Sequence, residues 1–430
     1  MNDRPASRLP WHRLAAVTLF SLALGVVSNT LEPAVLGHKV LELIPAQKNT
    51  ALGFTTFAGL TVAVLWQPIV GAWSDRTRGP WGRRTPYFLA GTALVAAGLY
   101  AIALAPTFAV VVAGVLLIQL ASNTVQGPWQ ALIPDQVPAG QRGAASGLKA
   151  AFDILAFVIG RQVSGRLVAS GNVVGAVSFA AGLFALALFL TLAAARERTT
   201  LEAPAPAPAA SGLRALAGSF AVDWRAHPAF AWWFANRLLF WGGFIALNTF
   251  LLFYLIDVVQ MAEAEAQRFV GNMSTVIGLV LLLVTLPSGW LADRLGRKPL
   301  VAASGLIAAA GTGMVLVVRT PAWITVAGAV IGLGVGVFLS ANWALVTDLV
   351  PPGEAARYLG IANIATAGGS GLARLIGGTL IDPLNRLLGN PSAGYLALYA
   401  LTMMGFLVGT LAITRVPESR PGVTAGGSPA

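Results

Sequence analysis

Long apolar segments recur along almost the whole chain, and they limit it to one kind of environment. A helix needs about 20 mostly apolar residues to cross the hydrocarbon core of a membrane. Twelve segments meet that requirement, at residues 13–36, 50–72, 86–105, 108–133, 144–169, 172–195, 229–256, 268–291, 299–318, 321–347, 357–381 and 393–414. Only 10% of the residues are charged, against about 25% in soluble proteins. The sequence therefore predicts an all-α membrane protein with twelve transmembrane helices.

A proline-rich segment divides these spans into two sets of six. Alternating alanine and proline at 203–208 cannot continue a helix and predicts a semi-rigid linker. The predicted organisation is a six-helix bundle at 1–195, a cytoplasmic linker at 196–228 and a second six-helix bundle at 229–430. The first span is too long to be a removable signal segment, and no small-residue cleavage site follows it.

The positive charges indicate how the chain is oriented. The chain has 28 Lys and Arg residues, 17 Asp and Glu residues and a formal net charge of +11. Most of the basic residues fall in segments on the same side as the two termini, which predicts that both termini are cytoplasmic. The charge is thus a topology signal, and nucleic acid is not an expected partner. Compact loops and abundant alanine favour a bacterial inner membrane.

The residues needed for several kinds of chemistry are missing. There are no cysteines and only three histidines, His12, His38 and His227, all near predicted span ends. A metal site, a disulfide framework and a thiol nucleophile are therefore not expected. The sequence contains no phosphate-binding loop of the Gly-x-x-x-x-Gly-Lys type. We expect no cofactor, no ATP hydrolysis by this chain and no enzymatic activity.

The two halves resemble each other in sequence. Gly71-x-x-x-Asp75-Arg76 recurs as Gly289-x-x-x-Asp293-Arg294, in each case after a second span. The stretch from Ala131 to Pro138 recurs at 344–351, and Arg161 and Arg374 follow at matching places. Two pseudo-symmetric six-helix bundles are typical of a transporter that rocks about a central site.

The loop after span eight carries a family resemblance. The run Gly289-Trp-Leu-Ala-Asp-Arg-Leu-Gly-Arg-Lys298 resembles the signature loop of the major facilitator superfamily. The first copy, from Gln67 to Pro86, is longer and is similar to that of the glycoside–cation symporters and proton-coupled sucrose carriers. The stretch Asn123–Asp135 is similar to the fourth-span motif of those carriers, although Gln130 stands where a basic residue is usual. The resemblance implies a proton-coupled sugar or glycoside symporter that works by alternating access, commonly as a monomer.

The loop charges are candidates for gating. Their carboxylates could bind an arginine or a helix N-terminus of the facing half and hold the cytoplasmic side shut. The alternative is that they only fix the topology at the lipid headgroups. The gating candidates are Asp75, Arg76, Arg83, Arg84, Arg142, Asp293, Arg294 and Arg297.

Three carboxylates are candidates for proton coupling. A charge inside a span is costly and is expected to face the bundle interior. Asp153 lies in the middle of span five, where it could titrate beside Arg161 or form a fixed structural pair with it. Glu32 precedes Pro33 in the outer part of span one, where an interfacial charge is the alternative. The resemblance implies coupling at Asp135, for which helix capping is the other interpretation.

Amides, indoles and arginines inside the spans are candidates for substrate binding. Amide groups both donate and accept hydrogen bonds, as hydroxyls require, and indole rings pack on the apolar faces of sugars. Packing and interhelical hydrogen bonds are the alternatives. The candidates are Asn29, Gln126, Trp129, Gln130, Arg161, Trp241, Asn248, Asn342, Trp343, Asn363 and Arg374. A proton-coupled exporter of drugs or metabolites with the same fold remains the alternative function.

Overall fold

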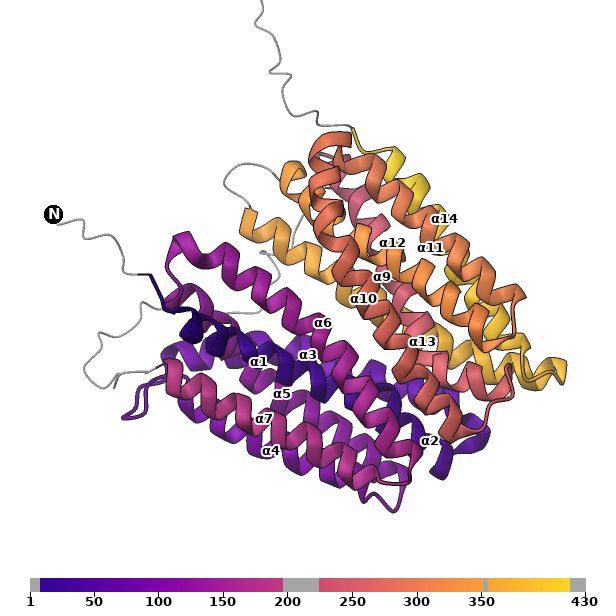
Figure 1. The fold of residues 1–430 in the computed structure, drawn as a ribbon, viewed down its shortest axis with the longest axis horizontal. Helices are drawn as coiled ribbons and strands as arrows, with labels where there is room; N and C mark the ends of the chain where they lie inside the picture. Colours follow the sequence, from indigo (N-terminus) through magenta and orange to yellow (C-terminus); the bar gives the residue numbers. More distant parts are fainter. Residues whose placement is uncertain (1–7, 196–223, 351–354, 418–430) are drawn as a thin grey trace, which may run out of the picture. The chain divides into compact units, whose positions relative to one another are not determined.

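The protein is helical in the computed structural model, which describes residues 8–195, 224–350 and 355–417. No β-strand occurs in these ranges. The first part of the chain forms α1 (Trp11–Asn29), η1 (Thr30–Val35), α2 (Leu36–Leu43), η2 (Pro45–Gln47), α3 (Lys48–Arg76), α4 (Thr85–Ala103), α5 (Phe108–Gln136), η3 (Ala139–Gln141), α6 (Arg142–Ala169) and α7 (Val173–Ala195). The second forms α9 (Pro228–Asp257), α10 (Glu263–Leu295), α11 (Arg297–Val317), α12 (Pro321–Leu349), α13 (Ala355–Leu388) and α14 (Ala393–Thr414) (Figure 1).

The predicted twelve spans are confirmed. Twelve helices of the described residues are long and apolar enough to cross a membrane. Several extend beyond their predicted ends: the first reaches Leu43 and the second covers Pro45–Arg76. Hydropathy detects only the apolar part of a helix, whereas the backbone hydrogen bonds continue into polar residues at its ends. The predicted linker at 196–228 lies mostly outside the described residues.

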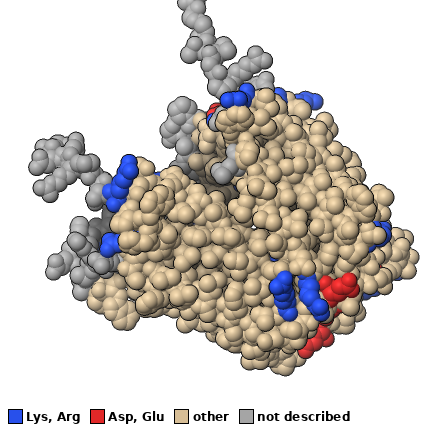
Figure 2. Space-filling view, in the orientation of Figure 1, with Lys and Arg blue, Asp and Glu red and all other residues tan. Residues whose placement is uncertain are grey.

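The outer surface suits a lipid environment. Large apolar side chains are exposed, including Phe189, Leu283 and Val317, which are 68%, 73% and 81% exposed. Figure 2 shows a broad face without Lys, Arg, Asp or Glu, with the charged side chains near its edges. Because each helix satisfies its own backbone hydrogen bonds, such a surface can be stable in lipid but not in water.

The chain forms two compact units that divide it differently from the two predicted bundles. Unit 1 comprises Met1–Ala209, Asn248–Gly278 and Arg374–Tyr395. Unit 2 comprises Ala210–Leu247, Leu279–Ala373 and Leu396–Ala430. Unit 1 thus holds the first six spans together with parts of α9, α10, α13 and α14. Each unit is described by itself below.

An aromatic cluster forms part of the core of unit 1. Phe20 on α1 packs against Phe88 on α4, Trp129 on α5 and Phe184 on α7, with ring centroids 5.0–6.1 Å apart. All four side chains are at most 1% exposed. Aromatic rings of this size supply much of the packing area in a helical bundle. The cluster holds four spans of the first half together.

Glycines let the helices of unit 1 approach closely. A Cβ at Gly25 of α1 would lie 2.5 Å from the Cβ of Ala156 on α6, and one at Gly160 would lie 2.8 Å from Asn29. On α3, a Cβ at Gly53 would lie 2.5 Å from the carbonyl oxygen of Arg374 and 2.7 Å from the Cα of Gly378, both on α13. Small residues at these crossings are typical of helix packing in membranes.

Unit 2 is built on the same principle. Phe240 of α9 stacks on Phe338 of α12, with centroids 3.7 Å apart, and also packs on Phe406 of α14. A Cβ at Gly334 of α12 would lie 2.8 Å from the carbonyl oxygen of Ser304 on α11. Glycine at this position therefore lets α12 pack closely against α11.

Candidate functional site

Arg161 lies at the centre of a polar cluster in unit 1. Its side chain on α6 is only 8% exposed. Its Nε donates to Asn29 Oδ1 on α1 at 3.2 Å, and its Nη1 donates to Asn248 Oδ1 on α9 at 3.0 Å. The guanidinium also lies over the ring of Phe157, 4.6 Å from its centroid. A buried charge is thus bound by neutral amides from two other spans.

An ion pair joins the first span to α13 in the same unit. Arg374 Nη2 on α13 lies 3.2 Å from Glu32 Oε2. Glu32 is in η1, where its φ of −111° and ψ of 126° interrupt the helical geometry of the first span. The Nε of Arg374 is buried without a hydrogen-bond partner in the described structure.

The packing of α1 against α6 positions this cluster. Gly160 allows the α6 backbone to approach Val26 and Asn29, so that Arg161, the next residue, reaches the Asn29 amide. The Asn29 Nδ2 donates to the carbonyl oxygen of Gly25 at 2.8 Å, which fixes the orientation of that amide. A second interhelical bond, 2.6 Å long, joins the hydroxyls of Thr30 and Ser164.

A second polar cluster lies in unit 2 around Arg237 of α9. Its Nε donates to Thr366 Oγ1 on α13 at 2.8 Å, and its Nη1 donates to Asn342 Oδ1 on α12 at 2.7 Å. The guanidinium lies 4.9 Å from the ring centroid of Trp343 and 5.6 Å from that of Trp233. Asn342 is fully buried, while Trp343 is 38% exposed.

A hydrogen-bond network within unit 1 joins the start of α3 to the ends of α9 and α13 and the start of α14. We call its residues, Lys48, Asn49, Thr50, Asp257, Asp382 and Tyr395, the end network. Asp257 accepts from Lys48 Nζ at 2.5 Å and from the Tyr395 hydroxyl at 2.7 Å. Asn49 Nδ2 donates to both Tyr395 and Asp382, and Asp382 also accepts from the Thr50 backbone N–H. This network lies at the helix ends away from the N-terminus of α1.

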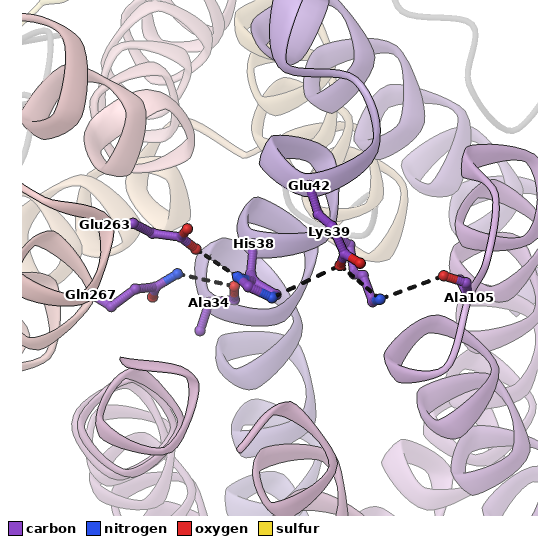
Figure 3. Close-up of polar contacts among 7 residues, drawn as sticks. All are labelled: Ala34, His38, Lys39, Glu42, Ala105, Glu263 and Gln267. Carbon is purple, nitrogen blue, oxygen red and sulfur yellow. Dashed lines mark hydrogen bonds and ion pairs between the residues drawn. The ribbon is translucent and has the colours of Figure 1, made fainter. Parts of the chain in front are cut away.

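A neighbouring set of contacts centres on α2. His38 Nδ1 lies 2.6 Å from Glu263 Oε1 on α10, and Gln267 Nε2 donates to the carbonyl oxygen of Ala34 at 3.2 Å. Figure 3 shows His38 between Glu263 and Glu42, with Lys39 reaching Glu42 and the carbonyl oxygen of Ala105. Segments of α2 and α10 are therefore held together by polar side chains.

Replacing Tyr395 by phenylalanine is expected to loosen the end network. The change removes the hydroxyl that accepts from Asn49 and donates to Asp257. Leaving such buried partners unpaired costs about 1–3 kcal/mol. We expect amide hydrogen exchange at the start of α3 to become at least about fivefold faster, measured by mass spectrometry. Tyr100→Phe, which removes a hydroxyl bonded to Ser178, is the matched control, and equal exchange in the two variants would contradict the expectation.

The structure brings several of the sequence-predicted residues together. Asn29, Arg161 and Asn248 are joined by hydrogen bonds, and Glu32 and Arg374 by an ion pair. Asn342 and Trp343 meet in the unit 2 cluster around Arg237.

Other predicted residues lie apart from these clusters. Asp153 is exposed and pairs with Lys149 at 2.7 Å rather than with Arg161. Trp129 is buried in the aromatic core, where its Nε1 donates to the Val17 carbonyl oxygen. The remaining positions are a half-buried Gln126, an exposed Gln130 bonded to Gln67, Trp241 packed on Phe244, and an exposed Asn363. The side chain of Asp135 is outside the described part of the structure.

Several of the gating candidates make contacts inside their own half of the chain. Arg84 lies 3.8 Å from Asp75, and Arg297 binds both Asp348 and the Ala344 carbonyl oxygen. Arg142 donates to the Val137 carbonyl oxygen, and Arg294 lies over the ring of Trp290. Arg76 is exposed and Arg83 is half-buried. The side chain of Asp293 is not among those described.

Arg237 and the end network are not among the site residues that the sequence predicts. Arg237 carried a usable signal, because it is a charge inside a predicted span. Lys48, Asp257 and Asp382 gave none, since charges near span ends are also what the membrane interface requires. Their role depends on pairings between residues more than 200 positions apart.

The sequence of the chain matches a known protein family. A model of the family described as MFS/sugar transport protein matches residues 46–414. The chain belongs to this family. The family and the fold are those of major facilitator (MFS) transporters and not of enzymes, so the chain is an integral, multi-pass membrane transporter.

Curated relatives match this MFS transporter over limited stretches. The minor myo-inositol transporter IolF of Bacillus subtilis (strain 168) is 31% identical over 131 residues, which is 30% of this chain and 28% of that protein. The multidrug resistance protein MdtH of Yersinia pestis (strain Pestoides F) is 30% identical over 155 residues, 34% of this chain and 36% of that protein. The matches span about a third of these relatives' length.

Solved structures match the transporter over almost its full length. The nucleoside transporter NupG has a TM-score of 0.72 at 14% identity, covering 94% of this chain and 98% of that one. The peptide transporter POT has a TM-score of 0.71 at 16% identity, covering 95% and 96%. A bacterial homologue of the human lysosomal transporter Spinster, in an inward-facing and unoccupied conformation, has a TM-score of 0.68 at 15% identity, covering 96% of both chains. At these identities the likeness shows the fold alone.

Proposed function

We propose that this transporter carries a sugar or glycoside across the membrane together with protons, by alternating access. The observation that carries the proposal is the buried cluster of Arg161, Asn29 and Asn248, which joins spans of both halves of the chain. The inositol transporter among the relatives also supports a polyhydroxylated substrate. We further propose a monomer in a bacterial inner membrane, with two six-helix bundles at 1–195 and 229–430 and both termini cytoplasmic.

The chemistry of the cluster favours a hydroxylated substrate. A guanidinium offers several N–H donors, and an amide offers both donors and an acceptor. These groups satisfy one another, as Arg161 does with two amide oxygens. Sugar hydroxyls can replace those bonds one for one, so that a polar solute binds without leaving a buried group unpaired.

Glu32 has the surroundings that a coupling carboxylate needs. It is half-buried on an interrupted helix and is paired with Arg374 of another span. Protonation of Glu32 would neutralise the pair and free Arg374, which would change the contact between η1 and α13. Asp153 is less suited, because it is exposed and already paired with Lys149 on its own helix. Asp135 stays a candidate on the strength of the resemblance alone.

The end network and the His38–Glu263 pair supply contacts that alternating access requires. In the proposed orientation they lie on the extracytoplasmic side and hold parts of α9, α10 and α13 against α2 and α3. An inward-open state needs that side closed, and an outward-open state needs those contacts broken. Gating by Asp75 and Arg297 on the cytoplasmic side remains part of the proposal.

Uptake into proteoliposomes tests the function. Purified protein would be given an inward proton gradient with labelled sucrose, maltose, glucose or myo-inositol outside. We expect accumulation of at least one of them, abolished by a protonophore. No uptake of any of these solutes by folded protein would contradict the proposal. The likeness to MdtH would then favour the export of other compounds by proton antiport.

Replacing Arg161 by glutamine is expected to weaken substrate binding. The variant loses the charge and part of the hydrogen bonding to Asn29 and Asn248. We expect the apparent KM for uptake to rise at least about tenfold, because a lost hydrogen bond to a charged group is worth about 1.5–3 kcal/mol. Arg166→Gln, an exposed position on the same helix, is the control. A KM unchanged in Arg161→Gln would remove Arg161 from the site.

A further inference from the structure

His38 of α2, in unit 1, lies between two carboxylates. Its Nδ1 is 2.6 Å from Glu263 Oε1 on α10, and its Nε2 is 3.9 Å from Glu42 Oε2, one turn later on the same segment. Lys39 Nζ also donates to Glu42, at 2.9 Å, so that Glu263, Glu42 and Lys39 are the charged groups around the ring (Figure 3). No charged side chain of the described parts of α3, α4 or α5, which also pack on α2, comes within ion-pair distance of it.

Both contacts of this ring are favourable only when the imidazole is protonated. An ionised carboxylate accepts hydrogen bonds and donates none, and a neutral imidazole carries an N–H on only one of its two nitrogens. A neutral ring at this position therefore turns a lone pair toward one of the two acids. A protonated ring presents an N–H on each side, and its positive charge attracts Glu263 and Glu42 together.

The ring can exchange protons with water. The side chain of His38 is 26% exposed, and those of Glu263 and Glu42 are 36% and 48% exposed. Histidine is the side chain that ordinarily changes its charge between about pH 5 and about pH 8. In the proposed orientation this end of α2 lies on the extracytoplasmic side, so that the proton would come from the water on that side.

A second polar contact joins the same two segments one turn away. Gln267, one turn after Glu263 on α10, donates to the carbonyl oxygen of Ala34, one turn before His38. This contact is closed to water, because Gln267 is only 1% exposed, and it does not depend on a proton. Ala34 belongs to η1, the interrupted segment that also holds Glu32. The charge on His38 therefore bears on how firmly the segment of Glu32 is held against α10.

A purely structural contact at this position does not require histidine. A glutamine could donate to Glu263 at every pH, as Gln267 does to Ala34. The other two histidines of the chain have different surroundings, since His12 is exposed and His227 packs edge-on against the ring of Tyr358. The placement between two acids favours a role for His38 that depends on its proton.

We propose that His38 is a proton-binding site separate from Glu32, and that its proton holds α2 against the start of α10. Protonated His38 binds Glu263 and Glu42 together, whereas neutral His38 can donate to only one of them. Acid therefore favours the joined arrangement, which weakens as the pH rises and His38 loses its charge. The proposal rests on the proposed proton-driven function and describes its regulation: the extracytoplasmic side closes more readily when protons are abundant there.

Distances between α2 and α10, measured without substrate or a proton gradient, test this. The chain has no cysteine, so spin labels on cysteines introduced at the exposed positions Ala46 and Ala262, just after α2 and just before α10, report on the contact in the full-length protein. We expect the ratio of joined to separated molecules to fall at least about threefold between about pH 5 and about pH 8, an effect of the size that an ion pair near a protein surface supplies.

Variants assign the pH response to the residue. His38→Gln is expected to abolish it, because glutamine can donate to Glu263 but cannot take up a proton. His12→Gln, the same substitution at an exposed histidine near the start of α1, is the matched control and should keep the full response. Glu263→Gln removes the charge that His38 faces on α10. It should reduce the response, and it serves if His38→Gln does not fold.

The possible failures are distinguishable. Distances that do not change with pH, or a response of equal size in His38→Gln and the unaltered protein, would overturn the role of His38 while sugar uptake stands. A response that disappears in Glu32→Gln and persists in His38→Gln would assign the proton to Glu32 instead. A failure of sugar uptake would overturn the proposed function, whereas the distances, measured without substrate, would still show whether His38 binds the proton.

Discussion

Replacing Glu32 by glutamine is expected to abolish proton-driven accumulation of substrate while leaving exchange of substrate intact. Glutamine has nearly the same shape as glutamic acid, so it imitates the protonated, uncharged state of the residue. It cannot release a proton and cannot re-form the ion pair with Arg374. The coupled step that returns the empty, deprotonated carrier would therefore be blocked, whereas exchange of bound for free substrate does not need it.

The measurement is uptake into proteoliposomes with and without a proton gradient, alongside counterflow of labelled against unlabelled substrate. We expect gradient-driven accumulation to fall by more than about tenfold, with counterflow within about twofold of the unaltered protein. Glu265→Gln, an exposed carboxylate at the start of α10, is the control. Accumulation that persists in Glu32→Gln would exclude Glu32 as the coupling residue and return attention to Asp135 and Asp153.

Replacing Gly53 by alanine is expected to force α3 away from α13. A Cβ at this position would lie 2.5 Å from the Arg374 carbonyl oxygen and 2.7 Å from the Gly378 Cα, and both are backbone atoms that cannot rotate aside. Overpacking of this kind costs about 1–3 kcal/mol, which is a shift of about five- to 150-fold in an equilibrium. Since α3 and α13 also share the Asn49–Asp382 and Thr50–Gly378 hydrogen bonds, the end network should open.

Spin labels measure this opening directly. The chain has no cysteine, so cysteines introduced at the exposed positions Gln47 and Asn390 would be its only labelled sites. We expect the distance distribution between them to shift to longer values in Gly53→Ala. Gly182→Ala on α7, where a Cβ meets nothing within 4 Å, should leave it unchanged. An unchanged distribution in both variants would show that the helices adjust without separating.

Much of the fold followed from the sequence, because a membrane allows few solutions. Twelve apolar segments predict twelve spans, and the structure has them. The ends of the helices were harder to predict, because polar residues extend α2 and α3 beyond the apolar segments that hydropathy detects. The repeat and the linker predict a division of the chain into two bundles. The compact units depend instead on contacts between helices, which the repeat does not encode.

The candidate site was predictable only in part. Polar residues inside a span, such as Arg161 and Asn248, could be selected because placing a polar group in a membrane costs free energy. Their partners could not, because they lie at least 87 positions away in the chain. Asp153 illustrates the limit, because Lys149, one turn earlier on the same helix, takes the role expected of Arg161. Trp129 illustrates another: a tryptophan buried in a core and one lining a site look alike in a sequence.

The charged contacts that join α2 and α3 to α9 and α10 all have the same polarity. In the end network and the His38–Glu263 pair, the carboxylates come from α9, α10 and α13, and the basic groups come from α2 and α3. Were these helix ends to part, Lys48 and His38 on one side would still attract Asp257 and Glu263 on the other across water, over a Debye length of about 8 Å at physiological ionic strength. This attraction would draw the separated helix ends back together. Because salt screens it, raising the salt concentration would lengthen the time that they stay apart.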